Sequence, residues 1–327
     1  MAIDRMHALL AEISGRFHLD VLANREVVDA AKASLAAHGK LGGREMPLKS
    51  PLVFWLVIML VLRRDRSVPN AFGTLVEACR DLAGGLSRKA VTDGGLAKAR
   101  QRLGPEPFET FFLKQAEARR APWFHGLRPV AADGVRLTMP DTEANRTRFP
   151  VQATGRGRAA WPQMLAVCLL DIADRRIAGA SFDDIHRGER ALGRTLWPRL
   201  DRDDLLIEDK GFFKKEDLWR LDAAGHTFVC KLPGKPKMKV LHEYGPGDCL
   251  VEMRGRRPRE AGEARDRGRG CRKHSKTFKL VVRLITYKVG GVEHRIVTNM
   301  FDREIAPEEF AKIYHWRWDA EIAYDEL

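Results

Sequence analysis

Asp204-Leu-Leu-Ile-Glu208 is a short apolar run bounded by acidic residues, and Asp209-Lys-Gly-Phe-Phe213 follows it directly. Such a run is typical of a buried β-strand, and the glycine after it is typical of a turn. We therefore expect Asp209 to stand at a strand end, where the chain leaves a sheet. In open α/β sheets, side chains at this edge face the crevice in which ligands bind.

Runs of the same character lie nearby and indicate an α/β core. Arg128-Pro-Val-Ala-Ala132 and Met164-Leu-Ala-Val-Cys-Leu-Leu170 are also typical of strands, whereas Gly188–Leu200 has helical spacing. Strands that alternate with a helix favour an α/β core, here from about residue 125 to residue 222.

A second acid, Asp133, has the same relation to its strand as Asp209. It ends the run that begins at Arg128, and Gly134 after it allows the backbone to turn. Cleavage of phosphodiesters with Mg²⁺ uses converging carboxylates that bind two cations. Taken singly, each aspartate is more often an ordinary turn cap.

The rest of the chain divides into a helical region and a β-rich region. Further strand candidates lie at Thr227–Lys231, Cys249–Met253, Phe278–Tyr287 and His294–Thr298. Pro307 to Leu327 has the pattern of a closing helix, with Pro307 at its start. We expect a helical domain at 1–120, a core with both aspartates at 121–224, a β-rich basic insertion at 225–302 and the last core helix at 303–327.

The charge of the chain favours a polyanionic partner. Lys and Arg total 57 against 44 Asp and Glu, a formal net charge of +13, which suits nucleic acid or an anionic membrane. The segment Arg254–Lys279 carries eleven of these cations among glycines, which predicts a mobile basic arm that follows phosphates.

The sequence disfavours a membrane, secreted or zinc protein. Leu52–Leu62 is too short an apolar run to cross a bilayer and predicts a buried helix. The N-terminus lacks a signal-peptide pattern, so we expect a cytoplasmic, nucleoid-associated protein with no membrane partner. The five cysteines are scattered without a C-x-x-C pair, and a zinc module would need the poorly spaced set His242, Cys249, Cys271 and His274.

The last segment resembles the tyrosine, arginine, glutamate, lysine signature of insertion sequence 4 family transposases. Tyr314, Arg317 and Glu321 stand at the spacing of that signature, and its lysine would fall just past Leu327. Three earlier blocks resemble the same family, namely Ala99–Gly104, Ala132-Asp133-Gly134 with Pro140-Asp-Thr142 and Asn145, and Ile207–Phe213 with Leu218-Trp219. The resemblance spans about residues 40 to 327.

The resemblance implies both a fold and an activity. It implies an RNase H-like, retroviral integrase-like core, with Asp133, Asp209 and Glu321 as a catalytic triad that holds two Mg²⁺ ions, for which Mn²⁺ substitutes. It further implies a transposase that binds the ends of an insertion sequence, cleaves DNA and joins the freed 3′-OH to target DNA. The expected partner is double-stranded DNA, bound by a homodimer.

Several cations are candidate DNA contacts. Tyr314 and Arg317 belong to the signature, Lys210 stands where the family usually has arginine, and the rest belong to basic stretches, namely Arg100, Arg102, Arg256 and Arg257. A helix around Val91–Leu103 would dock on the terminal repeats, although a solvated charged face explains it equally well. Trp316 or Trp318 would stack on an unpaired base, or belong to the core.

Two other functions fit the same features. One is a truncated, catalytically weak or inactive DNA-binding remnant, because the lysine of the signature is missing. The other is a simple metal-dependent nuclease, which three carboxylates on an RNase H-like core would permit. The spacing of Tyr314, Arg317 and Glu321 favours transposition over the nuclease.

Overall fold

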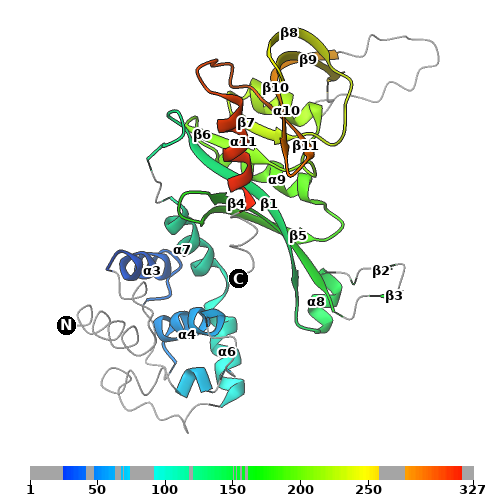
Figure 1. Ribbon diagram of the computed structural model, residues 1–327. Helices are drawn as coiled ribbons and strands as arrows, with labels where there is room; N and C mark the ends of the chain where they lie inside the picture. Colours follow the sequence, from blue (N-terminus) through cyan, green and yellow to red (C-terminus); the bar gives the residue numbers. More distant parts are fainter. Residues whose placement is uncertain are drawn as a thin grey trace, which may run out of the picture. The chain divides into compact units, whose positions relative to one another are not determined.

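The structure of the chain is a computed structural model (Figure 1). It describes residues 25–41, 48–62, 68, 70–73, 92–117, 121–149, 151, 153–154, 157–158, 161–257 and 277–318. The chain separates into two compact units, Met1–Ala118 and Arg119–Leu327.

The first unit is helical in its described parts. Its helices are α3 (Arg25–Ala37), α4 (Ser50–Leu62), α6 (Asp93–Leu103) and α7 (Glu106–Ala116). The apolar helix α4 supplies the centre of this core, where Phe54 is fully buried and stacks on Phe108 with ring centroids 4.6 Å apart. The expectation of a buried helix at Leu52–Leu62 is therefore confirmed. No helix in the described ranges has the length and apolar character that crossing a membrane requires.

The second unit is built on a large mixed sheet (Figure 1). Among the described residues its order is β5-β4-β1-β6-β7-β11-β10-β9-β8. The strands are β1 (Arg128–Thr138), β4 (Gln163–Asp171), β5 (Arg176–Asp184), β6 (Asp204–Glu208), β7 (Thr227–Lys231), β8 (Lys239–Gly245), β9 (Asp248–Arg256), β10 (Thr277–Val289) and β11 (Val292–Thr298). Strand β6 pairs parallel with β1 and β7, and the other pairs of neighbours are antiparallel.

Helices cover both faces of the sheet. Helices α9 (Glu189–Leu196) and α10 (Lys215–Ala223) pack on the face to which Ala132 and Leu206 point. Helix α11 (Pro307–Trp316), red in Figure 1, packs on the other face, against Ala131 and Ile207. Because side chains alternate along a strand, odd positions of β1 and β6 face α11 and even positions face α9 and α10.

Small elements complete the second unit. The 3₁₀ turn η2 (Trp197–Arg199) follows α9, and the short helix α8 (Glu143–Arg148) follows β1. The strands β2 (Ala153–Thr154) and β3 (Gly157–Arg158) form a separate two-stranded sheet.

The structure corrects the expectation of a turn at Gly134. Strand β1 continues through Asp133 and Gly134 to Thr138, held by antiparallel pairing with β4. Asp133 nevertheless lies just beyond the last residue of β1 that pairs with β6, which is Ala132. The pairing of β1 with β6 therefore ends just before Asp133, whereas its pairing with β4 continues to Thr138.

The region expected to be an insertion continues the core sheet. Strand β7 pairs parallel with β6, and β11, β10, β9 and β8 follow it outward in the same sheet. The buried Arg283 of β10 fixes this extension, because its guanidinium donates two hydrogen bonds to Asp248, with Nε–Oδ1 at 2.9 Å and Nη2–Oδ2 at 2.8 Å.

A buried ion pair joins the first core strands at the edge opposite to the two aspartates. Nε of Arg128 in β1 donates to Oδ1 of Asp204 in β6 at 2.7 Å, and Nη1 lies 3.6 Å from Oδ2 of Asp171 in β4. The side chains of Arg128 and Asp204 are 5% and 1% exposed, so neither charge is solvated by bulk water.

We predict that Arg128→Met lowers the free energy of unfolding by about 3–5 kcal/mol, because it leaves buried carboxylates without their cation. Urea unfolding followed by circular dichroism measures this change. The exposed Arg190 of α9 serves as the matched control, and Arg190→Met should change stability by less than about 0.5 kcal/mol. Equal effects of the two substitutions would contradict the structural role of Arg128.

Candidate active site

The pairing register of β1 with β6 brings Asp133 and Asp209 together. The last paired residues are Ala132 and Glu208, so the two aspartates come next, side by side at one edge of the sheet. Asp209 begins a turn in which its carbonyl accepts the N–H of Phe212 at 3.0 Å. The expectation of a strand-end acid is therefore confirmed for Asp209. By the alternation of side chains, both aspartates point to the face that α11 covers.

Helix α11 contacts both aspartates through two residues of the signature. The hydroxyl of Tyr314 donates to Oδ1 of Asp209 at 2.9 Å. Nη1 of Arg317, just after the helix, donates to Oδ2 of Asp133 at 3.0 Å. Tyr314 is 1% and Arg317 is 4% exposed, so both donors are buried, whereas the two carboxylates are partly exposed. In this structure the Tyr314 and Arg317 side chains therefore bind the carboxylates of Asp209 and Asp133. Their contact with DNA stays a prediction.

These contacts set the ionisation of the site. Burial alone would raise the pKa of Asp209, but the Lys210 N–H and the Tyr314 hydroxyl, with the charges of Arg317 and Lys231, bring the pKa below its usual value. Burial and the Asp209 carboxylate raise the pKa of Tyr314 well above the usual value. Tyr314 therefore stays a neutral donor and Asp209 stays a carboxylate at neutral pH.

A third carboxylate, Glu189, borders the two aspartates from the other side of the sheet. Glu189 begins α9 and lies against Gly134, where an added Cβ would come 2.9 Å from its Oε1, and near Gly211, where a Cβ would come 3.5 Å from its Oε2. Burial and then the charge of Asp133 raise the pKa of Glu189, and Asp209 adds to this rise. Gly134 is needed here for space, not for a turn.

The residue pattern around Glu189 did not predict that it belongs to the site. It precedes the apolar spacing of α9 and has the ordinary place of an acid in the first turn of a helix. A usable signal was the pair of glycines Gly134 and Gly211, each within two residues of a candidate aspartate. Only the fold shows that the Glu189 side chain occupies the space beside both glycines.

The opposite face of β6 carries a buried acid with a different role. Glu208 is 4% exposed and points to the side of α9 and α10. Burial, with a smaller contribution from the charge of Asp217, raises its pKa to about 8. Asp217 itself accepts a hydrogen bond from Nη2 of Arg194 at 2.8 Å.

The other predicted contact residues have exposed side chains or lie outside the described residues. Lys210 is exposed in the turn after Asp209, and Arg256 and Arg257 are exposed at the end of β9. Arg100 and Arg102 are exposed on α6 in the first unit. Glu321 falls outside the described residues, as do Cys271 and His274 of the zinc alternative.

The two tryptophans that flank Arg317 differ in exposure. Trp316 packs against the core under α11 and lies 5.2 Å from Trp123 between ring centroids. Trp316 therefore takes the core position that the sequence allowed as the alternative to base stacking. Trp318 is 56% exposed, so a base could reach its ring.

The donors at the aspartates suit a hard divalent cation. Carboxylate oxygens at adjacent strand ends are the ligands that Mg²⁺ prefers, but Asp133 and Asp209 are here bonded by Arg317 and Tyr314. Within the described ranges, no three His, Cys, Asp or Glu side chains are arranged to hold a metal ion. A metal at these two aspartates would therefore need Arg317 to leave Asp133 and a further ligand to join.

Comparison with known protein families agrees with this arrangement. Residues 125–327 match the family model "Transposase DDE domain", and residues 16–113 match "Insertion element 4 transposase N-terminal". The chain belongs to the insertion sequence 4 family of DDE transposases. DDE transposase domains have an RNase H-like fold and generally use divalent metal ions, and the mixed α/β sheet described above agrees with that fold.

Two relatives of this DDE transposase come from Escherichia coli (strain K12). "Transposase InsG for insertion sequence element IS4" is 26% identical over 300 residues, which are 90% of this chain and 64% of the relative. "Putative transposase InsZ" is 26% identical over 204 residues, which are 59% of this chain and 63% of the relative. The chain thus spans less than two thirds of the length of either relative.

The raised pKa of Glu208 predicts how stability depends on pH. Between its ordinary value of 4.5 and about 8, the folded protein keeps a proton that the unfolded chain has released. The wild type should therefore lose stability as pH rises through this window, by roughly 1.4 kcal/mol for each unit of pKa shift. Glu208→Gln keeps a neutral side chain and should remove this loss.

Urea unfolding of both proteins between pH 4.5 and pH 9 measures this difference, with exposed Glu293→Gln as the control. The Glu208→Gln protein should gain on the wild type as pH rises. A constant difference across the whole range would show that Glu208 is already ionised in the folded protein.

Proposed function

We propose that this transposase binds the ends of an insertion sequence, cleaves DNA with Mg²⁺ and joins the freed end to target DNA. The observation that carries the proposal is the pair Asp133 and Asp209 at one sheet edge, contacted by Tyr314 and Arg317 of α11. The family membership supports the same chemistry. Asp133 and Asp209 would hold Mg²⁺, or Mn²⁺ in its place, and the bound cation would supply the Lewis acidity that attack of water and then of a 3′-OH on phosphorus requires.

Each residue of the cluster has a distinct proposed task. Asp133 and Asp209 supply the metal ligands, and Glu321 supplies a third carboxylate. For Glu321 the support is its spacing in sequence, because Tyr314 and Arg317, which contact the two aspartates, would share a helix face with it. Arg317 would release Asp133 and hold a phosphate near the scissile bond, while neutral Tyr314 keeps Asp209 oriented.

Glu189 is proposed to act as an outer carboxylate of the same site. It approaches the aspartates from the side of α9, where Gly134 and Gly211 make room for it. Its charge would add attraction for a divalent cation at Asp133 and Asp209, and its oxygens would accept hydrogen bonds from water near that cation. Loss of the Glu189 charge should weaken the affinity for the metal ion more than it lowers the rate of cleavage at saturating metal.

The proposed partners follow from the same function. The substrate would be double-stranded DNA at terminal inverted repeats, held by a homodimer in the DNA complex, within the cytoplasm. The exposed cations Arg100 and Arg102 on α6 are candidates for contact with the repeats. A net charge of +13 supports a polyanionic substrate.

We predict that Asp133→Asn lowers Mg²⁺-dependent nicking of supercoiled or element-end DNA by about 100-fold or more, since even outer-shell changes at metal sites cost 10–100-fold. DNA binding in EDTA should persist, because Arg317 and the other cations remain. The control is Asp201→Asn, an exposed aspartate before β6, which should nick like the wild type. Equal nicking by the Asp133→Asn and wild-type proteins would remove Asp133 from the mechanism.

The same assay separates the role of Glu189. Glu189→Gln should raise the Mg²⁺ concentration for half-maximal nicking about 10–100-fold while saturating Mg²⁺ restores most of the rate. An unchanged Mg²⁺ dependence would place Glu189 outside the site. Binding without nicking by the wild type at any Mg²⁺ or Mn²⁺ concentration would instead favour a non-catalytic DNA-binding protein.

A further inference from the structure

A cluster of three cations around one carboxylate lies on the face of the sheet against which α11 packs. In β9, Met253 points into the core under α10, so its neighbours Glu252 and Arg254 point to the opposite face. Strand β10 places Lys279 opposite Arg254, and β8 places Lys239 opposite Glu252. We call Lys239, Glu252, Arg254 and Lys279 the Glu252 cluster.

The three cations of the Glu252 cluster share its one carboxylate. Nε of Arg254 donates to Oε1 of Glu252 at 2.5 Å, and Nζ of Lys279 lies 3.9 Å from Oε2. The hydrogen bond from Arg254 lowers the pKa of Glu252, and the charges of the three cations add to this effect. Glu252 is therefore ionised at neutral pH, and the cluster keeps a surplus of two positive charges.

The other acids of the three strands do not cancel this surplus. Asp248 of β9 faces the same side but is bonded to the buried Arg283, with Nη2–Oδ2 at 2.8 Å. Glu243 of β8 pairs with Cys249, which packs against the core under α10, so Glu243 points to that opposite face. Strands β8, β9 and β10, which are described throughout, hold no further acid.

The face that carries the Glu252 cluster is open to solvent. Helix α11 reaches across the sheet to Arg283, whose guanidinium lies 5.2 Å from the centre of the Phe310 ring. Farther along the strands, the side chains of Arg254 and Lys279 are 63% and 67% exposed, and Lys239 is exposed on β8. No described helix therefore lies over the cluster, and its cations are free to meet a polyanion.

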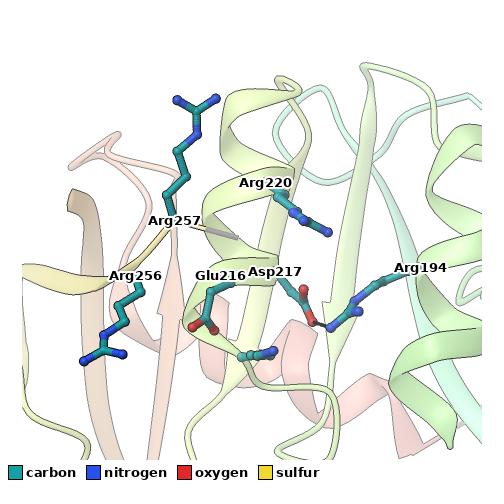
Figure 2. A pocket seen from close by; sticks show the side chains of 7 residues that line it. Arg194, Glu216, Asp217, Arg220, Arg256 and Arg257 are labelled. Carbon is teal, nitrogen blue, oxygen red and sulfur yellow. Dashed lines mark hydrogen bonds and ion pairs between the residues drawn. The ribbon is translucent and has the colours of Figure 1, made fainter. Parts of the chain in front are cut away.

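The opposite face of the same strands packs against α10, which keeps the Glu252 cluster in place. Trp219 of α10 stacks on Phe278 of β10, with ring centroids 5.1 Å apart. Figure 2 shows α10 beside the end of β9, from which Arg256 and Arg257 extend. Because the three paired strands have their backbones about 4.8 Å apart, the cations of the cluster are held at a fixed spacing.

This arrangement suits a long polyanion better than a small anion. A small anion is bound in a concave site that surrounds it, whereas the Glu252 cluster lies on an open sheet face. Across three strands the cluster spans about 10 Å. Duplex DNA carries one negative charge for about every 1.7 Å of its axis, so several phosphates can face the three cations at once.

We propose that the Glu252 cluster binds the phosphate backbone of duplex DNA and docks the duplex on the open face of β8, β9 and β10. The choice of DNA among polyanions rests on the proposed function. Lys239, Arg254 and Lys279 would contact phosphates. The Glu252 carboxylate would limit the affinity, because it competes with phosphate for the same cations. The contact adds affinity without reading base sequence.

The first test is equilibrium binding of a duplex in EDTA, measured by fluorescence anisotropy at several salt concentrations. Lys239→Gln/Lys279→Gln removes two exposed cations and leaves the pair of Arg254 and Glu252 intact, so it should fold normally, which the thermal midpoint verifies. Loss of each phosphate contact should weaken binding about tenfold at 0.1 M salt and reduce the log–log slope by about 0.9. The charge-keeping Lys239→Arg/Lys279→Arg protein should retain most of the slope.

The control for this lysine variant is Arg202→Gln/Lys288→Gln, which removes two exposed cations outside the cluster. It should bind within about twofold of the wild type, because salt screens charges that are distant from the duplex. Equal binding and slope for the lysine variant and this control, or a wild type that does not bind duplex, would overturn the proposal.

Glu252→Gln tests the cluster in the opposite direction. It removes the competing carboxylate, so the variant should bind duplex more tightly than the wild type, by up to about tenfold at 0.1 M salt. The matched control is Glu143→Gln, which removes an exposed acid outside the cluster and should change the affinity by less than about twofold. Equal affinities of Glu252→Gln and Glu143→Gln would count against docking at the cluster.

A last arm distinguishes DNA from other polyanions. Polyglutamate and vesicles that contain anionic lipid are titrated against the wild type and the lysine variant, and both should bind the wild type more weakly than the duplex does. Binding of either that depends on the cluster, with duplex affinity unchanged in the variant, would overturn the DNA assignment. Because all arms omit Mg²⁺, failure of Asp133→Asn to reduce nicking would count against the proposed chemistry and leave the docking result standing.

Discussion

Parallel pairing of β1 with β6 is the constraint on which the site depends. The register that ends at Ala132 and Glu208 sets Asp133 and Asp209 side by side, and the alternation of side chains turns both toward α11. Tyr314 and Arg317 then reach the carboxylates because α11 packs its apolar face on Ala131, Ile207 and their neighbours. A shift of one residue in this pairing would send one aspartate to the opposite face.

The acids on the two faces of the same strand end have pKa values that are shifted in opposite directions. On the α11 side, hydrogen bonds and cations keep the pKa of Asp209 low, whereas on the α10 side burial raises the pKa of Glu208 to about 8. The next layer on that side is the ion pair of Asp217 and Arg194. One strand end thus carries a carboxylate with a lowered pKa on one face and an acid with a raised pKa on the other.

Residue pattern predicted the interior of the sheet better than its margins. The seven inner strands are apolar runs, and each was expected from the sequence. The two that were missed, β5 and β8, are the edge strands, where exposure favours polar residues and weakens the alternating signal. The two aspartates were found because they follow apolar runs, whereas Glu189 and Arg194 come from a helix whose position no local pattern reveals. The joining of β7 to β11 in one sheet likewise depends on pairing between distant segments.

The central claim is that Asp133 and Asp209 bind a divalent cation together. The most direct measurement is anomalous diffraction from crystals of the protein soaked in Mn²⁺. The account predicts a peak at about 2.1 Å from an oxygen of each aspartate, with the guanidinium of Arg317 displaced from Asp133. Mn²⁺ found only elsewhere, with Arg317 and Tyr314 still bonded to the two carboxylates, would contradict it.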